Sequence, residues 1–321
     1  MHPSKSDWLT KNQLDPRVLE IQLELPKPQK VGKLTVDHKV VEKPKPRNRN
    51  QNLQYLMCIA QGGEHDKPWN QIEVFRRPVI MPEGFVVTRV YYDKTLWMTD
   101  AAQERYMMEF AAREAKGDVL VGGLGLGMYV QYALRNPKVD SITVVELSRD
   151  VVAIAKKLKW AKDKRVILHC GEISTELYKL GKKGMPRFDT VYLDVHPEIS
   201  PDFLPYLNSL REMARKVLTP KANKGHGRVY IWTYKKILSM ARHDLRSTLD
   251  IVSGMGFHSK VHREEFIEHF PIEGLFIKTL KRKKVELKDG YGLVEKFVQQ
   301  VRMTNGSLPL PMKGGKLKVE L

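Results

Sequence analysis

The chain has 321 residues, 42% of them hydrophobic, and a net charge of +18 with a sequence pI near 9.7. This length suits one large or two modest globular domains, and no apolar run is long enough to span a membrane. The two cysteines, Cys58 and Cys170, exclude a disulfide framework and a cysteine-rich metal site, so both are expected to be reduced thiols in or near the core. The first residues lack the apolar segment of a signal peptide, which favours a cytoplasmic location.

The excess of basic residues indicates a polyanionic partner, with nucleic acid as the expected class. The alternative is a lysine-rich surface that only aids solubility. No membrane partner is expected, and the chain could form a homodimer. Compact basic runs lie at 43–49, 156–159, 162–165 and 281–284.

Residues 1–70 are weakly patterned and basic. The alternating segment 21–25 predicts a strand. Residues 43–52 resemble an exposed arm or linker, and 53–60 predict a short helix that ends at two glycines.

A small β element is predicted at 71–98. Its strands are expected at 73–77, 84–92 and 95–98, and Asp93 and Lys94 form a tight turn between the last two. Thr99 or Asp100 is then expected to cap a helix that runs to about residue 115, with Glu104 near its first turn.

A glycine cluster follows the short apolar run after Asp118. Glycines let the chain turn sharply and let backbone N–H groups approach a ligand closely. Helical periodicity begins at Met128, and a second apolar run at 141–146 ends in Glu146, which is suited to accept hydrogen bonds from two ribose hydroxyls. The order strand, loop, helix, strand and acid predicts a nucleoside site, whereas the glycines alone would fit a turn without a ligand. The loop consists of Gly122, Gly123, Leu124, Gly125, Leu126 and Gly127.

This stretch resembles motif I and the following acid of class I S-adenosylmethionine-dependent methyltransferases. It is also similar to the spermidine synthase branch of that fold, in which a β-hairpin leads into a Leu-x-x-Thr-x-x-Asp-Glu-x-x-Tyr-x-Glu segment. Residues 96–109 read LWMTDAAQERYMME, an approximate match. The resemblance covers about 86–280 and implies S-adenosylmethionine, or its decarboxylated form, as the bound nucleoside.

The rest of the chain alternates strands and helices, which predicts an α/β fold with a Rossmann-like, doubly wound, mostly parallel sheet. We therefore divide the chain into 1–70, the β element 71–98, a nucleoside-binding domain at 99–285 and a basic tail at 286–321. Strands are predicted at 119–121, 141–146, 165–168, 188–194 and 228–232, with a closing pair at 257–261 and 275–280. Helices are predicted at 149–160, 201–218, 235–253 and 293–301, the first of them capped by Ser148.

Ligands of doubly wound sheets bind at the carboxyl ends of the strands, where Glu146, Glu172 and Asp194 fall. By resemblance, Glu172 contacts the adenine amino group, although an acid is also stabilised at a helix N-terminus without any ligand. Ile173 is then expected to pack against the adenine ring. The cofactor-binding residues implied are Gly122, Gly123, Gly125, Gly127, Glu146, Leu147, Gly171, Glu172, Ile173 and Asp194.

The candidate catalytic residues are Asp194 and His196. Asp194 could hold the substrate nucleophile, but the segment that follows it matches neither the Asn/Asp-Pro-Pro-aromatic motif of amine methyltransferases nor the Asp-x-x-Asp-Pro motif of spermidine synthases. His196 is a candidate general base near neutral pH, or a histidine that satisfies a loop backbone. No metal site is predicted.

Candidate substrate-binding residues are Tyr92, Trp97, Asp100, Trp232 and Tyr234. The aromatic rings could stack on a base or a sulfonium, although core packing is an equal or better explanation for the two tryptophans. Asp100 and Glu104 are among the acids that could attract a cationic substrate.

Three functions follow. The first is an S-adenosylmethionine-dependent methyltransferase that acts on nucleic acid. The second is an aminopropyltransferase, which the 96–109 segment favours, but leucines replace the acid usually found inside the glycine loop, and the second acid of the Asp-x-x-Asp-Pro motif is missing after Asp194. The third is a binding protein that retains the fold without catalysis.

Overall fold

The computed structural model describes residues 17–41, 84–182, 187–196, 199–224 and 229–254, together with 276, 280, 284, 285, 292–294 and 297. The chain forms two compact units. Unit 1 comprises Met1–Val195 and Val217–Trp232, and unit 2 comprises His196–Lys216 and Thr233–Leu321.

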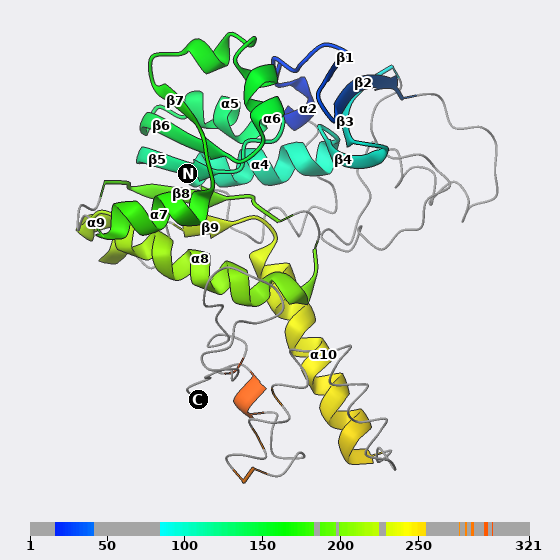
Figure 1. Cartoon of the computed structure of the whole chain (residues 1–321), viewed down its shortest axis with the longest axis vertical. Coiled ribbons are helices and arrows are strands. Elements are labelled where there is room, and N and C mark those ends of the chain that lie inside the picture. The colour runs from blue at the N-terminus through cyan, green and yellow to red at the C-terminus, as the bar shows by residue number, and fades with distance from the viewer. Residues whose placement is uncertain are drawn as a thin grey trace, which may run out of the picture. The chain divides into compact units, whose positions relative to one another are not determined.

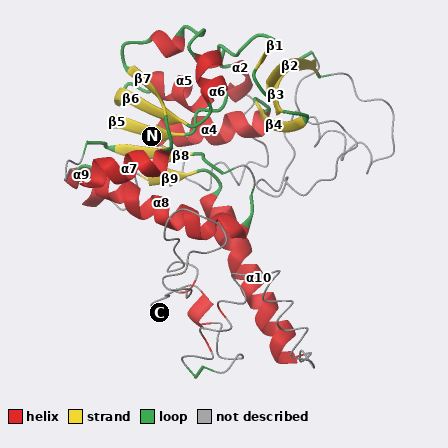
Figure 2. Cartoon of the chain, in the orientation of Figure 1, coloured by secondary structure: helices red, strands yellow, loops and turns green. Residues whose placement is uncertain are grey.

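A parallel five-stranded sheet forms the centre of unit 1, with strand order β7-β6-β5-β8-β9 (Figures 1 and 2). All four pairings between neighbouring strands are parallel, and the central strands β5 and β8 are almost wholly buried. The strand order reverses between β5 and β8, which makes this pair the switch point at which doubly wound sheets bind ligands. The predicted α/β Rossmann-like fold is thus confirmed. The strands are β5 (Gly117–Gly122), β6 (Val139–Glu146), β7 (Val166–Cys170), β8 (Thr190–Leu193) and β9 (Val229–Ile231).

The helices of unit 1 are α2 (Arg17–Glu20), α4 (Ala102–Glu114), α5 (Met128–Leu134), α6 (Arg149–Ala155), the 3-10 turn η2 (Trp160–Lys162), α7 (Ile173–Lys182) and α9 (Pro220–Lys224). Helices α4, α5 and α6 were predicted, with small shifts, whereas α2, α7 and α9 were not. Ser148 caps α6 as predicted, because its side chain accepts the N–H of Val151 at 3.3 Å. The helix ends earlier than predicted. The N-cap of α4 is Ala101 without a side-chain hydrogen bond, so the predicted cap at Thr99 or Asp100 is wrong.

A second, antiparallel sheet in unit 1 has the order β1-β2-β3-β4. Its strands are β1 (Gln29–Val31), β2 (Leu34–Val40), β3 (Val86–Tyr92) and β4 (Thr95–Thr99). The last two strands and the turn at Asp93 were predicted. The first two were not, and residues 21–25, predicted as a strand, have no strand structure. Instead the Gln131 side chain on α5 bonds both the N–H and the carbonyl of Glu24, at 2.8 and 3.1 Å.

Unit 2 contains η3 (Pro201–Phe203), most of α8 (Leu204–Val217) and α10 (Tyr234–Gly254), near the predicted helix positions. Phe276 and Leu280 are helical and buried, which contradicts the strand predicted at 275–280 at the two positions of it that the structure describes. Leu293, Val294 and Phe297 are helical, in agreement with the predicted helix 293–301. Segments 53–60, 73–77 and 257–261, and Cys58, lie outside the described residues. In the part of the chain that the structure describes, no helix has the length and apolarity needed to cross a membrane.

Candidate functional site

The glycine loop turns away from β5 in a space that admits no side chain. Gly123 has φ +84°, and a Cβ atom there would lie 1.9 Å from the carbonyl oxygen of Asp194. The chain is fixed on both sides, since Gly123 donates its N–H to Val145 at 2.9 Å and Asp194 donates its N–H to Gly122 at 2.7 Å. The loop therefore brings the ends of β5, β6 and β8 together at the switch point.

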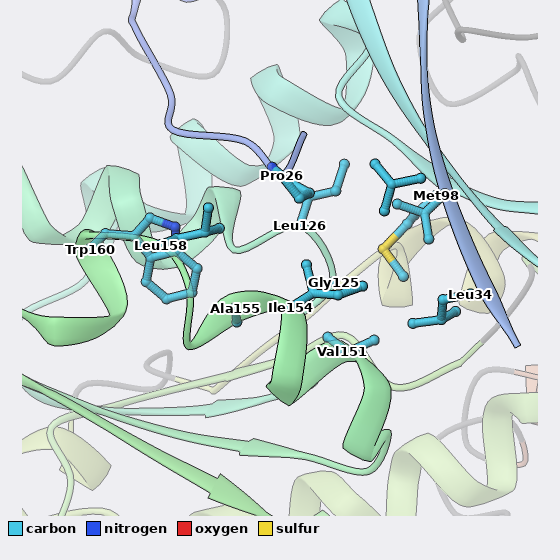
Figure 3. A pocket seen from close by; sticks show the side chains of 12 residues that line it. Pro26, Leu34, Met98, Gly125, Leu126, Val151, Ile154, Ala155, Leu158 and Trp160 are labelled. Carbon is cyan, nitrogen blue, oxygen red and sulfur yellow. The ribbon is translucent and has the colours of Figure 1, made fainter. Parts of the chain in front are cut away.

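The loop ends at Gly127, which precedes α5 and has φ +71°. A Cβ atom there would lie 2.4 Å from the ring of Trp160, a buried residue of η2. Trp160, Gly125 and Leu126 also line a small apolar cavity of about 20 Å³, together with Met98 and Leu34 of the antiparallel sheet (Figure 3). This volume is close to that of one water and the walls are apolar, so the cavity is a packing defect between the antiparallel sheet, the glycine loop and α6, and not a nucleoside site.

Glu146 lies at the carboxyl end of β6, where it was predicted, and is 6% exposed. Its Oε2 accepts the N–H of Leu124 at 2.7 Å, and its Oε1 accepts the N–H of Ser148 at 2.7 Å. A carboxylate has about four lone-pair positions, so two remain for further donors such as ribose hydroxyls. Its neighbour Leu147 is 71% exposed, which is unusual for a leucine beside a buried acid.

Glu172 lies before α7, and its carboxylate faces the first turn of that helix. Its two oxygens accept the backbone N–H and the hydroxyl of both Ser174 and Thr175, at 2.6–2.9 Å. Burial alone would raise the pKa of Glu172, but these hydrogen bonds outweigh it and hold the pKa below its usual value. The helix-capping alternative therefore describes the contacts that are present, and contact with adenine stays a prediction.

Two other predicted cofactor residues lie beside Glu172. Gly171 donates its N–H to the carbonyl of Glu146 at 2.9 Å, which joins this turn to β6. Ile173 is buried, and its side chain packs closely against Gly122. A Cβ atom added at Gly122 would lie only 2.7 Å from the Ile173 side chain. Cys170, predicted to be in or near the core, is exposed at the end of β7.

Asp194 follows β8 and is half-buried beside the glycine loop. Burial, assisted by the negative charge of Glu146, raises the pKa of Asp194 to about 7. Glu104, in the first turn of α4, is also half-buried, and burial together with the charge of Asp194 raises its pKa to about 8. Three carboxyl groups from β6, β8 and α4 therefore interact at this end of the sheet.

His196 begins unit 2 and is 6% exposed. Its Nε2 lies 2.9 Å from the hydroxyl of Thr233, and burial lowers its pKa to about 4. The imidazole is thus neutral at physiological pH. It would be a weak base, in contrast to the base near neutral pH expected from the sequence.

The predicted substrate residues do not form one cluster. Tyr92 and Trp97 are exposed and make an edge-to-face contact on the β3–β4 hairpin, with ring centroids 5.9 Å apart. Asp100 is fully buried and binds Arg105 at 2.6 Å and the N–H of Thr88 at 2.5 Å. Burial raises the pKa of Asp100 despite the opposing charge of Arg105.

The last two candidates lie in different units. The N–H of Trp232 extends the β8–β9 pairing by a 2.8 Å bond to the carbonyl of Leu193. The hydroxyl of Tyr234 donates to the side-chain oxygen of Asn208 at 2.6 Å. These contacts are structural, and a role for either residue in substrate binding stays a prediction.

Sequence reasoning named Glu104 among the acids that could attract a cationic substrate, but did not predict that it lies near Asp194. The available signal was an acid in the first turn of the helix that leads into the nucleoside-binding strand. Trp160 was also missed, although it is the aromatic residue inside a lysine run. Among the described residues, no group of three or more histidine, cysteine or acidic side chains could hold a metal ion.

No protein-family profile matches the chain. Curated relatives include polyamine aminopropyltransferases of Prochlorococcus marinus, strains MIT 9301 and AS9601, each 26% identical. Their alignments cover 43% and 46% of this chain and 54% and 57% of the relatives, so the chain spans about half the length of the curated relatives it matches. This similarity is consistent with the spermidine synthase-like branch of the class I methyltransferase superfamily that the glycine loop resembles.

Similar solved structures include spermidine synthase from Thermotoga maritima, with 15% identity and a TM-score of 0.32 over 41% of this chain and 45% of that chain. Human methyltransferase-like protein 13 in complex with SAH has 21% identity and a TM-score of 0.28, over 36% of this chain and 59% of that chain.

Proposed function

We propose that the chain is a transferase that binds S-adenosylmethionine or its decarboxylated form, with methyl transfer as the leading assignment. The observation that carries this proposal is the carboxylate of Glu146. It is buried at the tip of β6, fixed by two backbone N–H groups, and retains free lone pairs beside a loop that excludes side chains.

The residues present fit such a nucleoside. Glu146 would hold the ribose, and the exposed Leu147 offers an apolar surface to the adenine. When bound, the ligand supplies a sulfonium with an activated carbon. The naming of the curated relatives as aminopropyltransferases supports a ligand of this class.

Asp194 is the group best placed to handle a proton. With a pKa of about 7, its carboxyl can accept a proton from an amine nucleophile near neutral pH, which a carboxyl of ordinary pKa does poorly. Glu104 would share the charge that develops there, because the two carboxyl groups already influence one another. The protein otherwise needs only to align nucleophile and donor.

The glycine loop favours methyl transfer. In the aminopropyltransferase branch an acid usually stands within this loop, whereas here the two candidate positions are Leu124 and Leu126, both buried and uncharged. No second acid follows Asp194 in the segment Val195-His196. A substrate with several positive charges would also be repelled by a chain of net charge +18.

Aminopropyl transfer is the second candidate, and one structural feature favours it. Glu104 supplies, from a distant part of the sequence, a second carboxyl group, and it lies close enough to Asp194 that the charge of Asp194 helps burial to raise the pKa of Glu104. Two acids there would attract an ammonium group of a polyamine. The names of the curated relatives point the same way.

The test is calorimetric titration of the full chain with each form of the donor. Tight binding of S-adenosylmethionine that Glu146→Gln weakens at least tenfold supports methyl transfer, and preference for the decarboxylated form supports aminopropyl transfer. Asp140→Asn is the matched control, because Asp140 is an exposed acid at the opposite end of β6. Failure of both ligands to bind would refute the proposal.

Nucleic acid is the acceptor class that we propose for the methyltransferase. The support is the net charge of +18. Incubation with isotopically labelled S-adenosylmethionine and a mixture of RNA and DNA oligonucleotides tests it, and absence of label from every nucleic acid fraction, with binding of the donor intact, would contradict it.

A further inference from the structure

A dense run of lysines covers the connection between α6 and β7. It occupies the stretch 156–164. Three of its residues turn inward, since Leu158 and Ala161 pack against the core cluster and Trp160 is buried. This packing turns the intervening residues toward solvent. The lysines exposed here are Lys156, Lys157, Lys159, Lys162 and Lys164.

A second segment, distant in sequence, lies beside this run. Glu24 accepts the N–H groups of Lys159 and Trp160 at 2.7 and 3.3 Å through its Oε2. The ammonium group of Lys157 donates to the side-chain oxygen of Gln29 at 2.8 Å. The stretch that leads into β1 is thereby fixed against the lysine run, and it adds two further exposed lysines, Lys27 and Lys30.

We call these seven residues the lysine surface: Lys27, Lys30, Lys156, Lys157, Lys159, Lys162 and Lys164. The two acids within these segments have other partners, since Glu24 binds backbone N–H groups and Asp163 forms an ion pair with Arg165 at 3.1 Å. Within the described residues, none of the seven lysines forms an ion pair. Their positive charge is therefore available to a ligand.

We infer that the lysine surface binds the phosphate backbone of nucleic acid without reading its sequence. A membrane partner would call for apolar side chains that insert between lipids, and a protein partner for exposed aromatic anchors. The exposed large hydrophobic side chains of the described chain all lie elsewhere, and the exposed charged side chains of both segments are all lysines. Closely spaced cations without apolar anchors suit a regularly charged backbone.

The surface is joined to the nucleoside loop through one side chain. Trp160 lies within the lysine run, and its ring fills the space beside Gly127 at the end of the glycine loop. Both features belong to unit 1. A nucleic acid on the lysine surface would thus be held on the same compact unit as the nucleoside site. This inference deepens the nucleic-acid part of the proposed function but does not depend on which group is transferred.

The experiment is a salt titration of the affinity for a fluorescent single-stranded RNA of about 20 nucleotides, measured by anisotropy. The variant Lys156→Gln/Lys159→Gln/Lys162→Gln removes three charges that make no hydrogen bond through their side chains in the described structure. The control Lys94→Gln/Lys116→Gln/Lys138→Gln removes three exposed charges that do not belong to the lysine surface, one in the β3–β4 turn and two that precede β5 and β6.

We expect the slope of log affinity against log salt to fall by about 2 in the surface variant, since each lost phosphate contact on a single strand contributes about 0.7. At about 0.1 M salt this corresponds to an affinity loss of up to about a hundredfold. The control should keep the original slope, and donor binding measured by calorimetry should be unchanged in both variants.

Three outcomes would overturn the inference: an unchanged slope in the surface variant, an equal loss in the control, or no binding of RNA by the original chain. Binding only to vesicles that contain phosphatidylserine would equally overturn it and assign the surface to anionic lipid. Because donor binding is measured separately, loss of RNA binding with intact donor binding distinguishes this inference from the transferase proposal.

Discussion

The N–H of Leu124 donates to Glu146 Oε2 at 2.7 Å, although the two residues are 22 positions apart. This bond fixes the glycine loop to the tip of the neighbouring strand before any ligand arrives. Glu146→Gln would place an NH₂ group against one of the two backbone donors, and we expect a loss of about 1–3 kcal/mol in the free energy of unfolding. Urea denaturation without ligand measures this, and a loss no larger than that of Asp140→Asn would contradict it.

Gly123 and Gly84 allow the steric cost of the loop to be separated from backbone strain. Both have positive φ, +84° and +79°, but a Cβ atom at Gly84 has nothing within 4 Å, whereas at Gly123 it meets the carbonyl of Asp194. Gly84→Ala should cost about 1–2 kcal/mol. Gly123→Ala should cost more than about 3 kcal/mol, because backbone must move as well. Equal losses in urea denaturation would show that the close approach is not rigid.

The buried ion pair of Asp100 and Arg105 should be costly to break. Asp100→Ala leaves the Arg105 guanidinium, with a side chain only 6% exposed, without its carboxylate, and we expect a loss of about 3–5 kcal/mol. Glu176→Ala removes the exposed pair with Lys179 and should cost less than about 1 kcal/mol. If Asp100→Ala instead unfolds like the control but binds substrate poorly, Asp100 contacts substrate and its structural role is minor.

Glu104 should make the protein less stable as the pH rises. Its pKa is about 8 in the folded protein, so between pH 5 and 8 the folded state holds a proton that the unfolded state has released. Unfolding therefore becomes easier with rising pH through this window, and the effect is lost in Glu104→Gln. After allowance for its partial exposure, we expect roughly 1–2 kcal/mol between pH 6 and 9. If the free energy of unfolding of Glu104→Gln changed with pH in the same way as that of the original chain and of the exposed control Glu20→Gln, the prediction would be wrong.

Activity should rise with pH through about 7. A base must be deprotonated, and the Asp194 carboxyl, coupled to Glu104, titrates in that range, whereas His196 has a pKa of about 4. The profile of kcat/KM should therefore lose its rising limb in Asp194→Asn and keep it in His196→Gln. Formation of the demethylated or dealkylated donor, followed by chromatography, provides the measurement. Loss of the limb in the His196 variant alone would identify the histidine as the base.

The parallel sheet was predictable because its signals are local. Apolar runs, the glycine cluster and the caps specify β5, α5 and α6 within short windows, as at Ser148. The strand β2 was not predicted because its alternation of buried apolar residues is short. Leu34 and Val36 are buried, but His38 and Val40, which continue the alternation, are exposed. Its stability comes from pairing with β3, which includes the register pair Asp37 and Arg89, joined by a 2.7 Å ion pair.

The site shows the same division. The position of Glu146 could be predicted from the sequence, because the carboxyl ends of the strands in a doubly wound sheet lie at its ligand-binding edge. The interaction of Glu104 with Asp194 could not, since it joins residues 90 positions apart and depends on how α4 lies against the sheet. The roles predicted for Asp100 and His196 ignored burial, which the structure shows to be nearly complete for both.

The pairing of β2 with β3 has a kinetic consequence. The register runs from Val40 opposite Val86 to Leu34 opposite Tyr92, so the first pair alone closes a loop of about 45 residues. Pairings between such distant segments form slowly, whereas the β3–β4 hairpin needs only a two-residue turn. The antiparallel sheet should therefore grow outward from its hairpin during refolding, and burial of Leu34 and Val36 against it should be among the last events.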